Sequence, residues 1–308
     1  MAVEGPTDTA TASLLRVSTH AVRTHGPSAL GGSSRRFLEL TLTLARTEFK
    51  LRYFGSALGY LWSLMRPLLF FGVIYVVFTQ IFKIGAGVPH YGVYLLTGIV
   101  LWTYFAEATG GCVTSLVGRE AMLRKVRFPR MVIPLSVSLT SAFNLGMNFI
   151  AVIVFALVNG VPPTVLWLEM IPIALGFVVL ATGVGMLLSA LYVRFRDMQP
   201  IWEVTAQILF YASPIMYIAS RYAGIEHIAL LNPIAWLLTQ MGYAFVHPPA
   251  TVTHVGNTIV FTPTAMRSAF VASGGLGHSA IALGLIPAVF ALGWWFFTKE
   301  APRVAENV

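Results

Sequence analysis

Long apolar runs separated by short polar segments dominate the sequence from about residue 58 onward. A helix needs about 20 consecutive apolar residues to cross the hydrocarbon core of a bilayer. Six segments approach or exceed this length, and they are roughly Leu58–Phe82, Val93–Val117, Met131–Val158, Val165–Val193, Ile201–Ile218 and Ala280–Thr298. The pattern therefore predicts an all-α polytopic membrane protein with six transmembrane helices within residues 55–300.

The first of these segments contains a proline that affects where its helix begins. The residues from Pro67 to Phe82 would extend only about 24 Å at about 1.5 Å per residue, less than the roughly 30 Å of a bilayer core. We therefore expect the helix to begin upstream of Pro67. Arg66 then lies at the membrane edge, where its side chain either reaches the headgroups or faces protein.

The segment at residues 35–54, RRFLELTLTLARTEFKLRYF, shows a different pattern. Glu48 precedes Arg52 by one helical turn, so the two can form an ion pair within a helix. The alternating LTLTL would also suit a short strand, but a lone strand there has no partner. The segment therefore predicts an amphipathic interface helix on the inner membrane surface, with an apolar face formed by Leu38, Leu42, Ala45 and Phe49.

Residues 221–279 form a long segment between the last two apolar runs. Within it, NPIAWLLTQMGYAFV at 232–246 is apolar but too short to span a bilayer, so it suits a re-entrant or interfacial helix. Two β-prone runs at 252–261 flank Gly256-Asn257. This arrangement predicts a hairpin with a two-residue turn.

Basic residues are distributed unequally between the two sides that six spans would define. Seventeen of the twenty Lys and Arg residues fall on one side, and the other side holds Lys83, Arg221 and Arg267. The positive-inside rule therefore places the first side, with both termini, in the cytoplasm. The tail at 1–34 lacks the apolar core of a signal peptide and is expected to be mobile. Residues 301–308 are then a short cytoplasmic C-terminus.

The composition agrees with a membrane protein. Of the 308 residues, 56% are hydrophobic and 10% are charged, and the mean hydropathy is +0.75, far from the usual soluble domain. A net charge of +8 could suit nucleic acid, but that function would need a soluble basic face. Anchoring of cytoplasmic loops is the better explanation. The single cysteine, Cys112, excludes an intrachain disulfide.

The sequence also lacks the motifs of common catalytic and metal sites. No G-x-x-x-x-G-K-[ST] loop occurs, so the chain cannot bind ATP by that route. Neither H-E-x-x-H nor a paired-cysteine motif is present to predict a metal site. We expect no catalytic residue and no bound cofactor or metal.

Two charged features stand out within and between the predicted spans. Glu107 lies near the middle of the second span, where an ionisable residue is a functional candidate. It either belongs to a translocation path or hydrogen-bonds to another helix. Between spans two and three, GREAMLRKVRFPR at 118–130 contains five basic residues. This loop either fixes topology and binds lipid headgroups, or docks into a soluble partner that supplies energy.

Three stretches together resemble a known family. KLRYFGSALGYLWSLMRPLL (50–69), REAMLRKVRFPRMVIPLS (119–136) and LNPIAWLLTQMGYAF (231–245) occur in the order and at the topological places typical of that family. They resemble the permease subunits of ABC exporters for polysaccharides, teichoic acids and O-antigens. The resemblance extends over about residues 35–300.

The resemblance implies an assembly in the bacterial inner membrane. Two copies of this chain would form a homodimer with two ATPase subunits, which would bind the ATP and Mg. The 35–54 segment would be the interface helix, and the outer gate helices would lie around 224–246. The substrate would be a glycan on a polyprenyl-diphosphate lipid, a cell-wall galactan being one candidate. The coupling helix at 119–130 would contribute Arg119, Glu120, Arg124, Lys125, Arg127, Phe128, Pro129 and Arg130.

Aromatic and basic residues of the first two spans are candidates for the substrate path. Sugar rings pack their C–H faces on aromatic rings, although an interfacial aromatic belt would explain many of these residues equally well. Lys50, Arg52 and Arg66 could attract a lipid diphosphate at the entrance, as they could any anionic membrane lipid. The candidate path comprises Tyr60, Trp62, Phe70, Phe71, Tyr75, Trp102, Tyr104, Phe105 and Glu107.

Three other functions remain open from the sequence. The same architecture could export a drug or a simple lipid. A membrane-embedded glycosyl or phosphoryl transferase would need clustered acidic or His residues at one membrane face, yet only Glu120 and Asp197 lie in the cytoplasmic loops between spans. A structural anchor could recruit an ATPase without transport.

Overall fold

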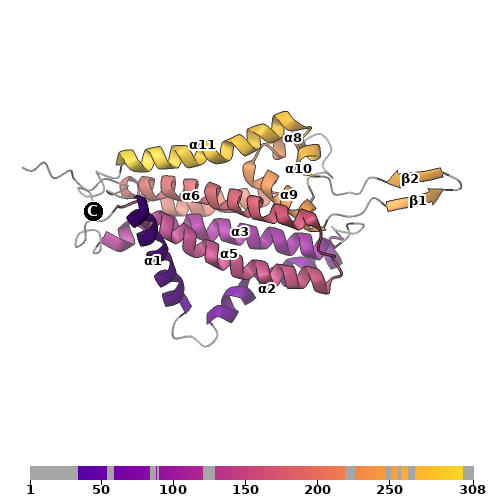
Figure 1. Cartoon of the computed structure of the whole chain (residues 1–308), viewed down its shortest axis with the longest axis horizontal. Coiled ribbons are helices and arrows are strands. Elements are labelled where there is room, and N and C mark those ends of the chain that lie inside the picture. The colour runs from indigo at the N-terminus through magenta and orange to yellow at the C-terminus, as the bar shows by residue number, and fades with distance from the viewer. Residues whose placement is uncertain are drawn as a thin grey trace, which may run out of the picture.

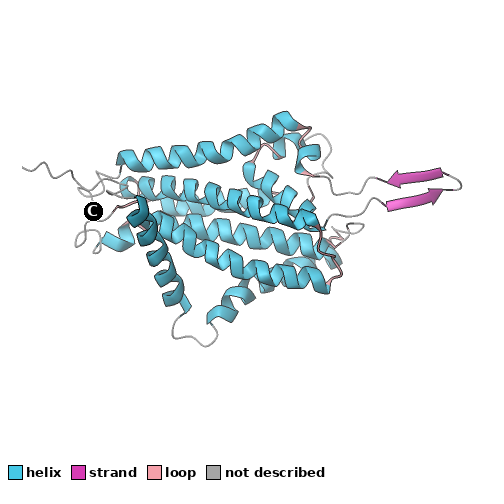
Figure 2. Ribbon diagram, in the orientation of Figure 1, coloured by secondary structure: helices cyan, strands magenta, loops and turns pink. Residues whose placement is uncertain are grey.

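The computed structural model describes residues 34–53, 59–83, 88, 90–120, 129–218, 226–246, 251–255, 258–262 and 268–300. Helices form an elongated bundle, and a β-hairpin extends beyond one end of it (Figure 1; Figure 2). The elements are α1 (Ser34–Tyr53), α2 (Gly59–Val76), η1 (Val77–Ile81), α3 (Tyr91–Val113), η2 (Val117–Arg119), α5 (Val132–Val158), η3 (Val165–Glu169), α6 (Met170–Arg194), α7 (Met198–Ala212), α8 (Glu226–Ala229), α9 (Pro233–Val246), β1 (Thr251–Val255), β2 (Thr258–Thr262), α10 (Ala269–Ala272) and α11 (Leu276–Glu300).

Within these described ranges, four helical segments are long and apolar enough to cross a membrane. They are predicted spans one, three, four and six. The expected upstream start of the first span is confirmed, because α2 begins at Gly59 and contains Pro67 in its interior. Arg66 is exposed on this helix. The four segments are Leu61–Ile81, Val132–Val158, Val165–Arg194 and Leu276–Glu300.

The second and fifth predicted spans are helical but less simple. α3 has 23 residues, or about 34 Å at about 1.5 Å per residue, which is long enough to span, but Glu107 and several small polar residues lower its hydropathy. α7 has 15 residues and ends at Ala212 instead of continuing to Ile218. The cause is Pro214, because a residue before proline is driven out of the helical region, and Ser213 is extended with ψ 144°.

α3 is the central helix of the bundle. It packs against α2, α5, α6, α7 and α9, and most of its side chains are buried. A helix buried on nearly every side can carry polar groups because neighbouring helices supply their partners. Its fully buried side chains include Leu95, Leu96, Ile99, Leu101 and Phe105.

α6 and α11 approach each other unusually closely at two glycines. A Cβ atom on Gly293 would lie 2.1 Å from the carbonyl oxygen of Gly183, and one on Gly183 would lie 2.6 Å from the Cα atom of Phe290. Small residues allow such close backbone contact between membrane helices. No larger side chain fits at either position without moving a helix.

α1 confirms that the segment predicted at 35–54 is helical, since it extends over Ser34–Tyr53. The helix packs against α5 with Phe37, Thr41, Ala45 and Tyr53 buried. Leu38 and Leu42 of the predicted apolar face are 58% and 38% exposed, so they remain available for a membrane surface. Ala45 of the same face is buried in the bundle, and this packing against α5 was not predicted.

The segment at 221–279 contains the predicted short helix and the predicted hairpin. α9 is almost entirely buried and contacts α3, α6 and α11. β1 and β2 pair antiparallel, with Val255 opposite Thr258. The two turn residues of the hairpin prediction lie outside the described residues.

Candidate functional site

Polar residues four positions apart form a buried stripe along α5. Positions with this spacing lie on one helical face. Three of them bond to α1: the Ser136 hydroxyl donates to Glu48 at 3.4 Å, Thr140 donates to the Ala45 carbonyl at 3.2 Å, and Asn144 accepts from the Tyr53 hydroxyl at 2.5 Å. The stripe comprises Ser136, Thr140, Asn144 and Asn148, and it attaches α1 to the bundle through polar contacts.

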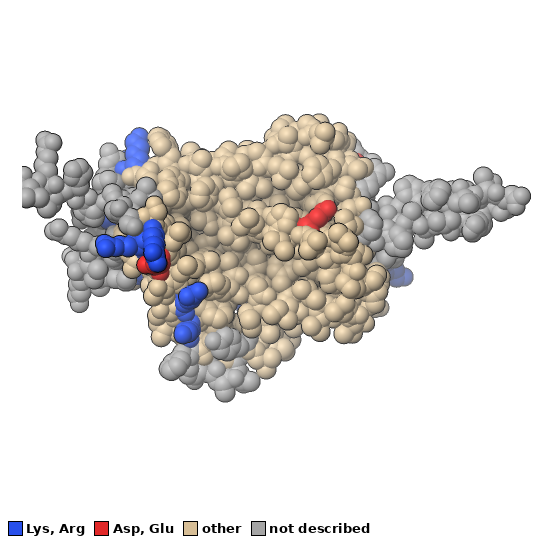
Figure 3. Space-filling view, in the orientation of Figure 1, with Lys and Arg blue, Asp and Glu red and all other residues tan. Residues whose placement is uncertain are grey.

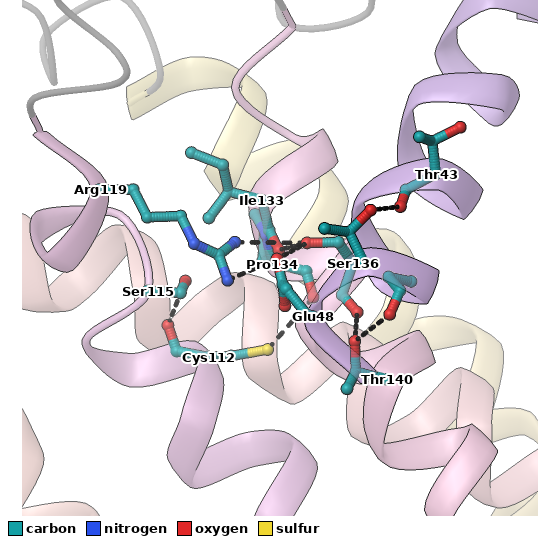
Figure 4. Close-up of polar contacts among 11 residues, drawn as sticks. Thr43, Glu48, Cys112, Ser115, Arg119, Ile133, Pro134, Ser136 and Thr140 are labelled. Atoms are coloured by element: carbon teal, nitrogen blue, oxygen red, sulfur yellow. Dashed lines mark hydrogen bonds and ion pairs between the residues drawn. The ribbon is translucent and has the colours of Figure 1, made fainter. Parts of the chain in front are cut away.

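The first cluster of charged and polar side chains along this stripe joins α1 to the predicted coupling segment. Nη2 of Arg119 lies 2.6 Å from Oε1 of Glu48, and Nη1 of Arg119 donates to the Ser136 hydroxyl at 3.3 Å (Figure 4). The two charged side chains are only 24% and 20% exposed. Glu48 therefore pairs with Arg119 across the fold, and the predicted pair of Glu48 with Arg52 is wrong.

The second cluster of charged and polar side chains joins α1 to the central helix, α3. Arg52 forms an ion pair with Oε1 of Glu107, and the Asn144 amide donates to the same oxygen at 3.0 Å. Because Asn144 also accepts from Tyr53, the network links α1, α3 and α5. Burial acts to lower the pKa of Arg52, but the charge of Glu107 and its hydrogen bond outweigh that effect and raise the pKa. Arg52 therefore stays cationic.

The structure thus brings together two residues that the sequence assigned to different roles. Arg52 was predicted at a lipid entrance and Glu107 on a translocation path. Their pairing through Asn144 was not predicted. The available signal was the recurrence of polar residues every four positions in an otherwise apolar span, since polar groups inside membrane helices usually have a protein partner or a function.

The other predicted coupling residues are only partly described. Glu120 follows η2 directly, Pro129 is buried, and Arg130 is half-buried before α5 begins. Burial lowers the pKa of Arg130 from its ordinary value. The remaining candidates lie outside the described residues, and they are Arg124, Lys125, Arg127 and Phe128.

Several predicted path aromatics belong to the interior of one subunit. The Trp102 ring lies 5.5 Å from both Phe105 and Phe210, measured between ring centroids. Phe105 in turn lies 6.2 Å from Trp202 of α7. Tyr104 is also buried. Contact of these rings with a substrate would require the surrounding helices to part.

Other path and entrance candidates lie at the surface. Trp62, Phe70 and Tyr75 are 64%, 45% and 38% exposed along α2, whereas Phe71 is buried. Lys50 and Arg66 are exposed on α1 and α2. The side chain of Tyr60 lies outside the described set, although its backbone belongs to α2.

Charge is concentrated at one end of the molecule. In the space-filling view, most visible Lys, Arg, Asp and Glu side chains gather around α1, while a broad band of the bundle shows almost none (Figure 3). A charged end, a wide apolar band and long apolar helices define an integral membrane protein. The polar contacts that attach α1 to α5 lie at this charged end.

Comparison with known proteins identifies the class further. Residues 39–246 match the family described as ABC-2 type transporter. The O-antigen export system permease protein RfbA of Klebsiella pneumoniae is 32% identical over 211 residues, covering 68% of this chain and 81% of the relative. A second Klebsiella pneumoniae RfbA is 30% identical with the same coverage. RfbA of Myxococcus xanthus is 32% identical over 207 residues, covering 65% and 78%.

The chain therefore belongs to the ABC-2 type transporter family. It is a multi-pass membrane permease and not an enzyme, as its family membership shows. The family resemblance predicted from the three sequence stretches is confirmed.

Proposed function

We propose that this chain is the permease of an ABC exporter that moves a polyprenyl-diphosphate-linked glycan from the cytoplasm across the inner membrane. The observation that carries this proposal is the similarity to an O-antigen export permease over 68% of the chain. Substrates of that kind combine a lipid, a diphosphate and sugars. The chain offers apolar helices, exposed cations and aromatic rings to match each part.

In this proposal the chain crosses the membrane six times. α3 is long enough to span, and α7 would complete its crossing with the residues that follow Ala212. Both termini and the 119–130 segment would lie in the cytoplasm, as the excess of basic residues on that side favours. α8, α9 and α10 would then form the gate region on the outer side.

Energy would come from separate subunits. Two copies of this chain would pair with two ATPase subunits, which would hold the ATP and Mg. Residues 119–130 would dock into the ATPase, and Arg119 supports this role because it connects the segment to α1 through Glu48. Purified chain without partners should therefore hydrolyse no ATP. Turnover in a preparation shown to be free of ATPase subunits would contradict this division of labour.

The lipid diphosphate would enter near the exposed end of α1. Lys50, Arg52 and Arg66 would attract it, because charge-assisted hydrogen bonds from cations to phosphate oxygens are strong. Arg52 is held by Glu107 in the structure, so a phosphate oxygen would compete with that carboxylate. Exchange of one anion for the other would release α1 from α3 when substrate arrives.

The test is the fate of the glycan in cells depleted of this protein. We expect lipid-linked glycan to accumulate inside and to disappear from the cell surface. Restoring the chain should reverse both changes. If a simple lipid or a drug accumulates while the surface glycan is unchanged, the substrate assignment is wrong. If glycan synthesis stops without any lipid-linked intermediate, a transferase function is favoured instead.

A further inference from the structure

A cavity of about 750 Å³ lies where the end of α2 and η1 meets the start of α3 and the end of α5. Small-molecule sites typically have volumes of about 300–1,000 Å³, so its size is suitable for a ligand. The cavity is distant from the α1 site. It adjoins Tyr91, the first residue of α3, whereas Glu107 is sixteen residues further along the same helix.

Aromatic rings form one wall of the cavity. The Phe71 ring lies 5.3 Å from Phe155 and 5.4 Å from Tyr75 between centroids. A Cβ atom on Gly92 would lie 3.2 Å from the Tyr75 ring, so the glycine leaves room for this ring at the start of α3. Tyr91 completes the wall, and its hydroxyl donates to the Met216 carbonyl at 2.6 Å.

Polar side chains form the rim. Lys83, His90, Thr79 and Asn159 all line the cavity. Among the described residues, no ion pair engages Lys83. The amide nitrogen of Asn159 donates to the Phe155 carbonyl at 2.8 Å, which leaves its oxygen as an acceptor. The Thr79 hydroxyl donates to the Tyr75 carbonyl at 2.6 Å, so it also offers an acceptor. The rim therefore presents a cation and two acceptors beside the ring wall.

The backbone around the cavity is irregular in two ways. η1 is a π-helical turn of five residues at the end of α2. Lys83 and His90 both have left-handed backbone, with φ of 53° and 49°, a conformation that side-chain-bearing residues adopt at a cost. π-helical turns and strained residues are found frequently at functional sites, and here both border the same cavity.

We propose that this cavity binds a saccharide unit of the transported glycan at the outer face of the protein, an inference that rests on the proposed function. The ring wall suits the C–H face of a sugar, and the rim suits its hydroxyl groups. A purely apolar ligand would cover the rim without pairing it, and buried polar groups without partners are unfavourable. The site would hold the glycan after it leaves the transmembrane path.

Cysteine labelling tests the inference in assembled transporter. The native Cys112 is fully buried, so an introduced cysteine would be the main reactive thiol. Asn159→Cys would place it on the rim of the cavity. Leu157→Cys is the matched control, because Leu157 is 49% exposed on the same helix end and does not line the cavity. The probe is a membrane-impermeant maleimide added to spheroplasts.

Labelling rates are compared between cells that make the glycan and cells blocked at the first sugar transfer to the lipid. Only unoccupied sites react, so an occupancy of about 80% would slow labelling of Asn159→Cys about fivefold. The Leu157→Cys rate should be equal in both cells. Thr79→Cys gives a second rim position if Asn159→Cys fails to assemble, and the same slowing is expected there.

Surface glycan is also measured in glycan-producing cells with and without this protein. If its export does not depend on this protein, the proposed function fails. If export depends on the protein but the rim cysteine reacts equally fast in both cells, the cavity is not a saccharide site and only this inference is overturned. The same conclusion follows if Leu157→Cys is slowed as much as the rim cysteine, or if no rim cysteine reacts from outside.

Discussion

Arg52, near the end of α1, donates a hydrogen bond to the carboxylate of Glu107 in α3, across 55 positions of sequence. The pair joins the peripheral helix of the molecule to its central helix. The two side chains are 44% and 31% exposed, so the pair lies at the surface of the helical bundle and not in its core.

A double-mutant cycle should detect this connection. We expect a coupling energy of about 1 kcal/mol between Arg52→Ala and Glu107→Ala, because partly exposed pairs are worth up to about that amount. The measurement is the thermal stability of purified protein. Arg35 and Glu39 provide the control, since they form an ion pair on the same helix but are 89% and 61% exposed. Equal coupling in both cycles would show that the contact with α3 adds nothing.

The predicted coupling segment should separate into structural and docking residues. Arg119→Ala should lower the free energy of unfolding by about 1–3 kcal/mol, because it leaves the largely buried Glu48 without its cation. Reversal of Arg124 and Lys125 to Glu should weaken co-purification with the ATPase, or uncouple ATP hydrolysis from transport. A reversed variant that assembles and transports normally would remove the docking role.

The aromatic candidates should divide by burial. Trp102→Ala should reduce folding yield, because removal of a buried Trp typically costs about 3–5 kcal/mol. Phe70→Ala should fold, since Phe70 is 45% exposed, yet reduce transport by up to about tenfold if one aromatic contact of about 0.5–1.5 kcal/mol is lost. Tyr75→Ala should behave like Phe70→Ala, since Tyr75 is 38% exposed. Assembly and glycan export are scored separately, and normal export by both variants would identify Phe70 and Tyr75 as belt residues.

The glycine crossing of α6 and α11 should be intolerant of side chains. We expect Gly293→Ala to destabilise the protein by about 1–3 kcal/mol, the usual cost of overpacking, because the new methyl would collide with the Gly183 backbone. Gly284→Ala is the matched control on the same helix, where no atom lies within 4 Å of the added Cβ. That change should be neutral or slightly stabilising, since Ala is the better helix former. A melting temperature measured in detergent separates the two.

The elements that were predicted from the sequence are those whose structure depends on residues close to them in the chain. The bounds of α1, the start of α2 before Pro67 and the pairing of β1 with β2 follow from spacing, length and turn residues. Even the early end of α7 has a visible cause in Pro214. In each case a few neighbouring residues determine the backbone, so the pattern could be interpreted without knowledge of the rest of the fold.

The face of α1 that packs against the bundle could not be predicted in this way. Its own residues indicate an apolar face for the membrane surface but do not show which side meets another helix. That side is determined by α5, which carries Ser136, Thr140 and Asn144 on the face that meets α1. The partners of Glu48 and Arg52 are likewise distant in sequence. Only the fold shows which polar groups meet, although the four-residue spacing in α5 marked that helix as having polar partners.

The contact between Gly183 and Gly293 also determines where this molecule can bend. Two backbones in van der Waals contact cannot rotate or slide past each other without a collision, so α6 and α11 act mechanically as one stiff strut. At Gly72 of α2, by comparison, an added Cβ atom would meet no atom within 4 Å, and Trp62, Val73 and Ile81 are exposed on α2 and η1. If the bundle opens for a bulky cargo, we therefore expect α2 to move and α6 and α11 to stay together.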